Sequence, residues 1–418
     1  MKTYLLYTAI LLSLWACQPA QDRDSAEAED VISVVGTFGY DLEFLQNNLD
    51  EVIVLKDETG DAQLILAPEY QGRVMTSTAR GEEGRSFGWI NYDLIASGEV
   101  RPQFNPYGGE DRFWLGPEGG QYAIFFEEGD DFVFADWQTP APLDTEAFEV
   151  VSKSERAATF TKTMQLENYS GTRFTLDVER RIQLLDSTDI ADELDLSPDM
   201  LRVDYVGFSS ENRITNTGDM DWTQEDGLLS IWILGMFIHS PATTVLIPYN
   251  DDPGLAVPSV NDSYFGKVPD DRLVVEDGFI FFKGDGAYRS KIGVAPERAR
   301  PVMGSYDPDN QLLTIVRFSL PEGKTDYVNS MWELQNHPYD GDVVNAYNDG
   351  PLESENNQLG PFYELESSSP AAELAVGESL SHQHTTAHFM GERAALNELS
   401  LQILGIGLDQ IEKVFEAQ

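Results

Sequence analysis

Short apolar or β-branched segments, each bounded by Gly, Pro, Asn or Asp, follow one another along most of this 418-residue chain. Such segments favour β-strands, and the Asp-Gly pairs at 226–227 and 277–278 favour tight turns between them. Because no repeat of fixed period and no linker interrupts the pattern, it predicts one large antiparallel β-sandwich. The clearest strand segments are residues 51–56, 62–67, 122–126, 131–135, 158–164, 173–176, 273–283 and 312–318.

Helical signals are few. A short helix is expected over residues 41–49. In residues 393–418, Leu399, Ile403 and Phe415 recur near helical spacing, interrupted by glycines. We expect this C-terminal helical segment to pack on the sandwich through those three side chains, because exposed apolar rows are rare on soluble proteins.

The first residues have the pattern of a secretory signal. Lys2 precedes an apolar run that ends at Ala16, which is too short to span a bilayer, and Cys17 follows. The segment resembles a bacterial lipoprotein signal, which implies cleavage after residue 16 and lipidation of Cys17. The alternative is an ordinary signal peptide or anchor helix with a chance Cys. Residues 17–32 are polar and acidic and read as a flexible tether.

That resemblance implies a location in the cell envelope, with the membrane reached through the lipid anchor only. Residue 18 is Gln and not Asp, which favours the outer membrane in the sorting pattern of such lipoproteins. Cys17 is the single cysteine of the chain, so the fold cannot depend on disulfides.

The charge balance excludes one class of partner. The chain carries 72 acidic and 27 basic residues, a net charge of −45. Nucleic acid is therefore not expected as a partner, because phosphate binding requires clustered Lys and Arg. We interpret the dispersed charge as an adaptation to a salty environment, the alternative being simply an acidic family.

Two stretches of the chain look like common functional motifs but do not meet the full requirements of those motifs. Residues 84–88 match the letters G-x-S-x-G of a nucleophile elbow, but no apolar strand precedes the Ser, and the strand-like residues 89–92 follow where a helix is required. We expect a hairpin turn there. Residues 323–325 look like the end of a phosphate-binding loop but lack its first glycine.

Four segments carry a resemblance to a known superfamily. In chain order they are a strand-turn-strand over 62–79, a Gly- and aromatic-rich loop over 105–121, a strand ending in Asn-Thr-Gly within 210–222, and a two-strand unit over 360–389. They look like the galactose-mutarotase-like superfamily, which includes aldose 1-epimerases and β-sandwich domains of polysaccharide-degrading enzymes. The resemblance covers roughly residues 50–390 and implies that residues 33–392 form one such sandwich domain.

Within that resemblance, Glu366 is the expected catalytic base. The step Leu365-Glu366-Ser367-Ser368 is similar to the Leu-Glu-Thr-Gln step of aldose 1-epimerases, whose Glu takes the proton from the anomeric hydroxyl. A carboxylate on a concave sheet is partly desolvated, which raises its pKa toward the useful range. Glu364 shares its side of the strand and is expected to bind substrate. The alternative is that both pair with an Arg or cap the sheet.

Three of the chain's five histidines share one parity on the following strand: His382, His384 and His388. We expect His384 to act as a proton donor and His382 to bind substrate. A divalent metal held by the three histidines is a second possibility, although no cofactor is otherwise expected. The third is a set of ordinary hydrogen-bonded histidines.

The chain departs from the epimerase pattern where the family's acidic His should stand. A His-Pro-Tyr step exists only at 337–339, later than the family order requires, so we expect Tyr107 or another group to replace the acid. A carbohydrate ligand is also indicated by the composition of the 105–121 loop, which combines flat aromatic faces with polar groups. The candidate sugar-binding residues of this loop are Asn105, Glu110, Arg112 and Trp114. Trp114 is equally suited to the core.

Three functions remain open at this point. The first is an enzyme that isomerises a sugar or cleaves a glycan by carboxylate and His acid-base chemistry. The second is a non-catalytic glycan-binding surface lipoprotein. The third is a structural envelope protein with an inherited fold.

Overall fold

The structure, a computed structural model, describes residues 34–351 and 358–416. All of these lie in one compact unit, Ser33–Gln418. The predicted signal peptide, Cys17 and the tether up to residue 32 lie outside the described residues. Among the helices of the described part, none has the length and apolar character that a membrane crossing needs.

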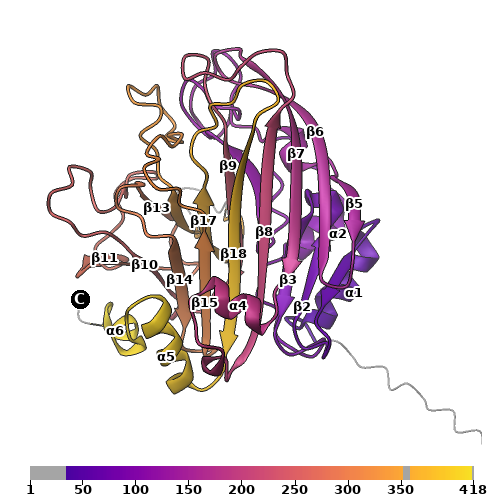
Figure 1. The fold of residues 1–418 in the computed structure, drawn as a ribbon, viewed down its shortest axis with the longest axis vertical. Helices are drawn as coiled ribbons and strands as arrows, with labels where there is room; N and C mark the ends of the chain where they lie inside the picture. Colours follow the sequence, from indigo (N-terminus) through magenta and orange to yellow (C-terminus); the bar gives the residue numbers. More distant parts are fainter. Residues whose placement is uncertain (1–33, 352–357, 417–418) are drawn as a thin grey trace, which may run out of the picture. The chain divides into compact units, whose positions relative to one another are not determined.

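Antiparallel strands make up most of the fold (Figure 1). They are β1 Ile53–Lys56, β2 Gln63–Ala67, β3 Arg73–Thr78, β4 Arg112–Gly116, β5 Glu149–Lys153, β6 Ala157–Glu167, β7 Arg173–Leu184, β8 Asp204–Asn216, β9 Ser230–Ile238, β10 Thr244–Pro248, β11 Leu273–Glu276, β12 Phe279–Lys283, β13 Ser290–Val294, β14 Val302–Asp307, β15 Leu312–Phe318, β16 Val344–Asn348, β17 Phe362–Ser368 and β18 Ser379–Met390.

These strands form three sheets. The largest has the order β11-β12-β10-β14-β15-β18-β8-β7-β6-β5, and its long central strands run side by side in Figure 1. A five-stranded sheet has the order β13-β16-β17-β9-β4, and β1-β2-β3 form a small third sheet. The predicted mainly β, antiparallel sandwich is confirmed.

The two large sheets pack face to face, and strand alternation explains how. Along β7 buried and more exposed residues alternate from Arg173 to Leu184. The apolar row of β7 shares one core cluster with the inward row of β4 and β9. That cluster includes Phe174, Leu176 and Val178 from β7, Phe113 and Leu115 from β4, and Ile231 and Ile233 from β9.

Helices are short and peripheral. They are α1 Phe38–Asn48, α2 Tyr92–Ser97, α3 Ala141–Asp144, α4 Ser187–Glu193, α5 Arg393–Ile403 and α6 Leu408–Lys413, with 3-10 turns at Pro68–Tyr70 and Pro198–Met200. The helix expected at 41–49 is confirmed as α1. It begins three residues earlier than expected because the hydroxyl of Thr37 accepts from the Tyr40 backbone N–H and caps the first turn.

The C-terminal helical segment is two helices, α5 and α6, separated at Gly405, whose φ of +83° ends the first. Leu399 is fully buried in a cluster with Leu313 and Ile315 of β15, while Ile403 and Phe415 pack against it partly buried. The segment therefore covers one end of the ten-stranded sheet through its apolar row.

Three strand predictions are wrong. Residues 122–126 and 131–135 form turns, because the Asp130 carboxylate accepts from the Glu127 backbone N–H and the rings pack into a loop cluster instead of a sheet. Residues 89–92 make only isolated bridges before α2 begins at Tyr92. The expected 105–121 loop contains strand β4. Gly109, with φ +111°, lets the chain pass so close to Arg73 that a Cβ would lie 2.6 Å from its side chain.

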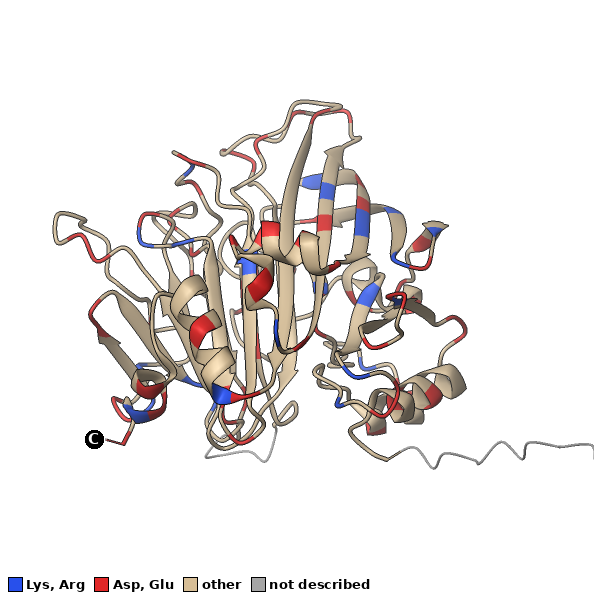
Figure 2. Ribbon diagram, turned by 60° about the horizontal axis from the view of Figure 1, so that its bottom comes forward, with Lys and Arg blue, Asp and Glu red and all other residues tan. Residues whose placement is uncertain are grey.

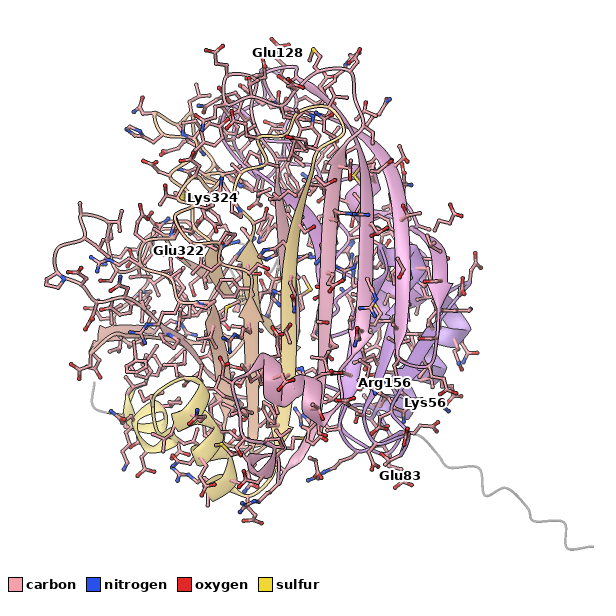
Figure 3. The ribbon with its side chains drawn as sticks, in the orientation of Figure 1. Lys56, Glu83, Glu128, Arg156, Glu322 and Lys324 are labelled. Carbon is pink, nitrogen blue, oxygen red and sulfur yellow. The ribbon has the colours of Figure 1, made fainter. Side chains whose placement is uncertain are left out.

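The small sheet is tied to the ten-stranded sheet at its edge. The Lys56 backbone N–H donates to the Glu155 carbonyl at 2.9 Å, which places Lys56 beside the turn that carries Arg156 (Figure 3).

Asp and Glu are spread over helices, strands and loops instead of gathering on one element (Figure 2).

Candidate functional site

Strand β17 separates its residues between two environments. Tyr363 and Leu365 join the core between the large sheets, and the Tyr363 hydroxyl hydrogen-bonds Ser305 of β14 at 2.7 Å. Because alternate residues of a strand point to opposite faces, Glu364 and Glu366 lie on the other face. That face of the five-stranded sheet is covered by loops and forms the floor of a cavity.

Glu366 is held by two neighbouring strands. Its Oε2 accepts from the Lys291 ammonium of β13 and from the Trp232 indole N–H of β9, both at 2.9 Å. The Glu366 side chain is fully buried and that of Lys291 is 9% exposed. Glu364 forms the second ion pair, accepting at Oε1 from Arg112 Nη2 of β4 at 3.1 Å.

The electrostatics of the two ion pairs differ. Burial raises the pKa of Glu364 to about 8 despite the neighbouring Arg112, and the charge of Glu366 adds to the rise. Burial opposes the charge on Lys291, yet the carboxylates of Glu366 and Glu118 outweigh it and raise the Lys291 pKa. Glu364 therefore holds its proton at neutral pH while Lys291 stays charged.

Glu118 is a second carboxylate that lines the same cavity. Burial raises the pKa of Glu118, opposed by Lys291 and by a hydrogen bond to Trp332. Glu118 follows the cis peptide bond between Gly116 and Pro117, at the point where the chain leaves β4. The cavity lining thus includes two acidic residues, Glu364 and Glu118, and three basic ones, Arg112, Lys291 and Arg289.

Aromatic rings form most of the walls. Arg112 lies over the Trp114 ring at 4.1 Å and Lys291 over the Trp232 ring at 4.6 Å, so each cation also faces a π-surface. The inner cavity has a volume of about 80 Å³ and opens beside an outer one of about 850 Å³. Aromatic lining residues of the inner cavity are Phe104, Trp114, Phe134, Trp137, Trp232, Phe265, Trp332, Tyr347 and Phe362.

Several buried polar atoms on this side of the sheet lack hydrogen-bond partners within the described residues. They are Nε and Nη1 of Arg112, Oε1 of Glu366, Nε1 of Trp137 and Nε of Arg289. Buried polar groups are almost always paired, so the unpaired donors of Arg112, Trp137 and Arg289, which line one cavity, indicate a polar ligand.

The structure brings together four of the predicted site residues: Glu364, Glu366, Arg112 and Trp114. Trp114 lines the cavity and also packs among Phe104, Phe125 and Trp137.

The predicted histidines lie on the opposite face from Glu366. The hydroxyl of Ser367, the next residue of β17, hydrogen-bonds His382 Nε2 and His384 Nδ1, each at 2.8 Å, within the core. Burial lowers the pKa of His382 to about 3 and that of His384 to about 4, so both are neutral near pH 7. His384 therefore lies on the other side of the five-stranded sheet from Glu366 and is not placed to act with it as the expected proton donor.

Glu110 belongs to the same core. It accepts from the Ser77 hydroxyl at 2.9 Å and hydrogen-bonds His388 Nε2 at 2.9 Å, while His388 Nδ1 contacts the Thr314 hydroxyl. His382 and His384 thus share the Ser367 hydroxyl, whereas His388 contacts Glu110 and Thr314. Across residues 34–351 and 358–416, no group of three or more His, Cys, Asp or Glu side chains is arranged to hold a metal ion.

Two further predicted residues lie away from the cavity floor. Tyr107 stacks on Tyr70 with ring centroids 4.0 Å apart and is 5% exposed. Asn105 donates to the Asp144 carboxylate at 2.7 Å. Neither lines the inner or the outer cavity, because Gly108 and Gly109 turn the chain between them and β4.

Sequence reasoning missed Lys291, Trp232 and Glu118. Lys291 gives a signal in retrospect, since it is the single charged residue of the otherwise apolar or small strand Ser290–Val294. A lone Lys on a buried strand requires a partner. Nothing local identifies that partner as Glu366, which lies 75 residues further along the chain.

Comparison with solved structures agrees with this architecture. The Slr1438 protein of Synechocystis sp. PCC 6803 is 15% identical, with a TM-score of 0.51, covering 82% of this chain and 98% of its own. A galactose mutarotase-like protein from Lactobacillus casei is 11% identical, with a TM-score of 0.47, covering 81% and 100%. The galactose mutarotase related enzyme of Lactobacillus acidophilus is 8% identical, with a TM-score of 0.44, covering 82% and 98%.

The similarity to Slr1438 concerns the fold alone. No curated protein matches the sequence. The family of unknown function DUF6786 matches residues 36–415, and the chain belongs to that family.

Proposed function

We propose that the protein binds a carbohydrate in the cavity over the five-stranded sheet and transfers protons on it. The observation that carries the proposal is Glu364 in the floor of this cavity, beneath aromatic walls and beside unpaired polar atoms, with Glu366 buried next to it on the same face of β17. Carbohydrate sites combine flat apolar platforms with a few placed polar groups.

The two carboxylates have complementary roles in this proposal. Glu366 has one unpaired oxygen, Oε1, and is the base that takes the proton of the anomeric hydroxyl. Glu364, with its pKa near 8, is protonated at neutral pH and donates to the ring oxygen. The C1–ring oxygen bond then opens, and reversal of the steps closes the ring to either anomer. Glu364 replaces Tyr107 and His384 as the proposed acid.

The test begins with a glycan array on the soluble form, followed by proton NMR of each bound sugar. Glu366→Gln keeps the side-chain length but removes the acceptor, so turnover should fall roughly a hundredfold or more while affinity changes little. His384→Asn is the matched control, because it changes a buried polar group on the other face. Its pH profile should keep the wild-type shape. Intact turnover in Glu366→Gln would contradict the catalytic role.

One observation favours a second candidate, a glycan-binding protein without turnover. Both carboxyl groups are fixed by buried cations, Glu366 in an ion pair with Lys291 and Glu364 by a hydrogen bond from Arg112, and groups fixed in this way also serve as hydrogen-bonding platforms. Binding without change of the NMR spectrum, abolished in Trp114→Ala, would establish this function. In either case we propose that lipid on Cys17 anchors the protein at the outer membrane, as the signal pattern favours.

A further inference from the structure

The outer cavity extends the site well beyond the reacting end of a ligand. It shares Glu118, Lys291 and Arg289 with the inner cavity, and its volume is about 850 Å³ against about 80 Å³. Pockets that enclose whole organic ligands have volumes of about 300–1,000 Å³. Most of a ligand whose end reaches Glu364 must therefore lie in the outer cavity.

The rim of this outer cavity carries exposed aromatic rings. Phe134 is 47% exposed, Phe265 49% and Tyr288 39%, and all three line it. Exposed large aromatic side chains at a cavity are platforms for flat or ring-shaped groups. Phe134 and Phe265 line both cavities and Tyr288 lines the outer one only, so the aromatic surface continues from the inner cavity outward and can contact more than one ring of a ligand.

Arg289 is the unusual cation of the site. It lines both cavities, and its guanidinium lies 5.0 Å from the Phe265 ring. Arg112 and Lys291 each have a carboxylate partner, whereas Arg289 forms no ion pair or side-chain hydrogen bond with any described residue, and its Nε is buried without a partner.

The acidic residue Asp349 does not form an ion pair with Arg289. Asp349 interacts with Arg289 only through its charge, because one of its oxygens accepts from Tyr347 at 2.5 Å and the other from the Gly360 backbone at 2.9 Å. In a chain with 72 acidic and 27 basic residues, an unpaired Arg facing a cavity requires a specific reason.

Resting on the proposed carbohydrate function, we infer that the ligand is an anionic oligosaccharide, with Arg289 binding a carboxylate or sulfate ester on a ring in the outer cavity. Arg forms bidentate, charge-assisted hydrogen bonds with both groups. The exposed rings of Phe265 and Tyr288 contact the sugar faces next to that group.

Calorimetry with matched sugar pairs tests this inference. One pair is a galacturonic acid tetrasaccharide and its methyl ester; the other is a sulfated galactan tetrasaccharide and its desulfated form. We expect one anionic member to bind about tenfold tighter than its neutral partner, with the preference weakening as salt is added. The pair that shows the preference identifies the anion. The corresponding anionic monosaccharide should bind more weakly than the tetrasaccharide.

Arg289→Gln should abolish the anionic preference, because it should weaken binding of the anionic member about tenfold more than binding of its neutral partner. The control Lys267→Gln removes the same charge from an exposed residue that pairs with Asp262, and should retain the preference. Equal binding of charged and neutral partners, or equal loss for both in Arg289→Gln, would overturn the anionic inference; a monosaccharide that binds as tightly as the tetrasaccharide would overturn the oligosaccharide one. None of these results would contradict the proposed function. Failure of every sugar in the array would refute the proposed function itself.

Discussion

Replacing Lys291 by Met would leave the Glu366 carboxylate buried without its counter-ion. The two charges are 2.9 Å apart, and their side chains are 9% and 0% exposed. At an effective dielectric constant of about 20, their Coulomb attraction is about 6 kcal/mol. Relaxation and entry of water recover part of that loss, so we expect the free energy of unfolding to fall by about 3–5 kcal/mol. The Trp232 indole remains as the one described donor to Glu366.

The assay is thermal and urea unfolding of the soluble chain followed by circular dichroism. With an unfolding entropy of about 2 cal/mol/K per residue, the expected loss lowers Tm by about 4–6 °C for a unit of this length. The double variant Lys291→Met/Glu366→Gln removes both charges and should regain most of the stability. The control Lys153→Met breaks an exposed pair with Glu51, which should cost less than about 1 kcal/mol. A loss below about 1 kcal/mol in Lys291→Met, or no recovery in the double variant, would refute the buried-pair argument.

Two further predictions concern the second carboxylate and the anchor. Because burial raises the pKa of Glu364 from its ordinary 4.5 to about 8, the folded state keeps a proton that the unfolded chain releases. Stability should therefore fall as pH rises through that interval, by up to about 1.4 kcal/mol per pH unit. Glu364→Gln should flatten this slope in urea titrations, and an unchanged slope would contradict the assignment. Cys17→Ser should release the protein from the membrane fraction and abolish labelling by a fatty-acid probe; labelling that persists would rule out the lipid anchor.

The β-architecture and part of the site were accessible from sequence because their causes are local. Alternation along Phe362–Ser368 is enough to place Glu364 and Glu366 on one face of a strand, whatever that strand packs against. Turn pairs such as Asp277-Gly278 separate β11 from β12 without reference to the rest of the chain.

Tertiary structure decided which face each strand turns to the cavity and which distant residues meet there. His384 shares the chain region of Glu366 but packs from the other sheet, against Ser367. Arg112 reaches Glu364 across 252 residues of sequence, and Lys291 reaches Glu366 across 75. The two-residue period of a β-strand determines that its side chains alternate between two faces. Only the stacking of the two sheets determines which of these faces belongs to the core and which faces a ligand.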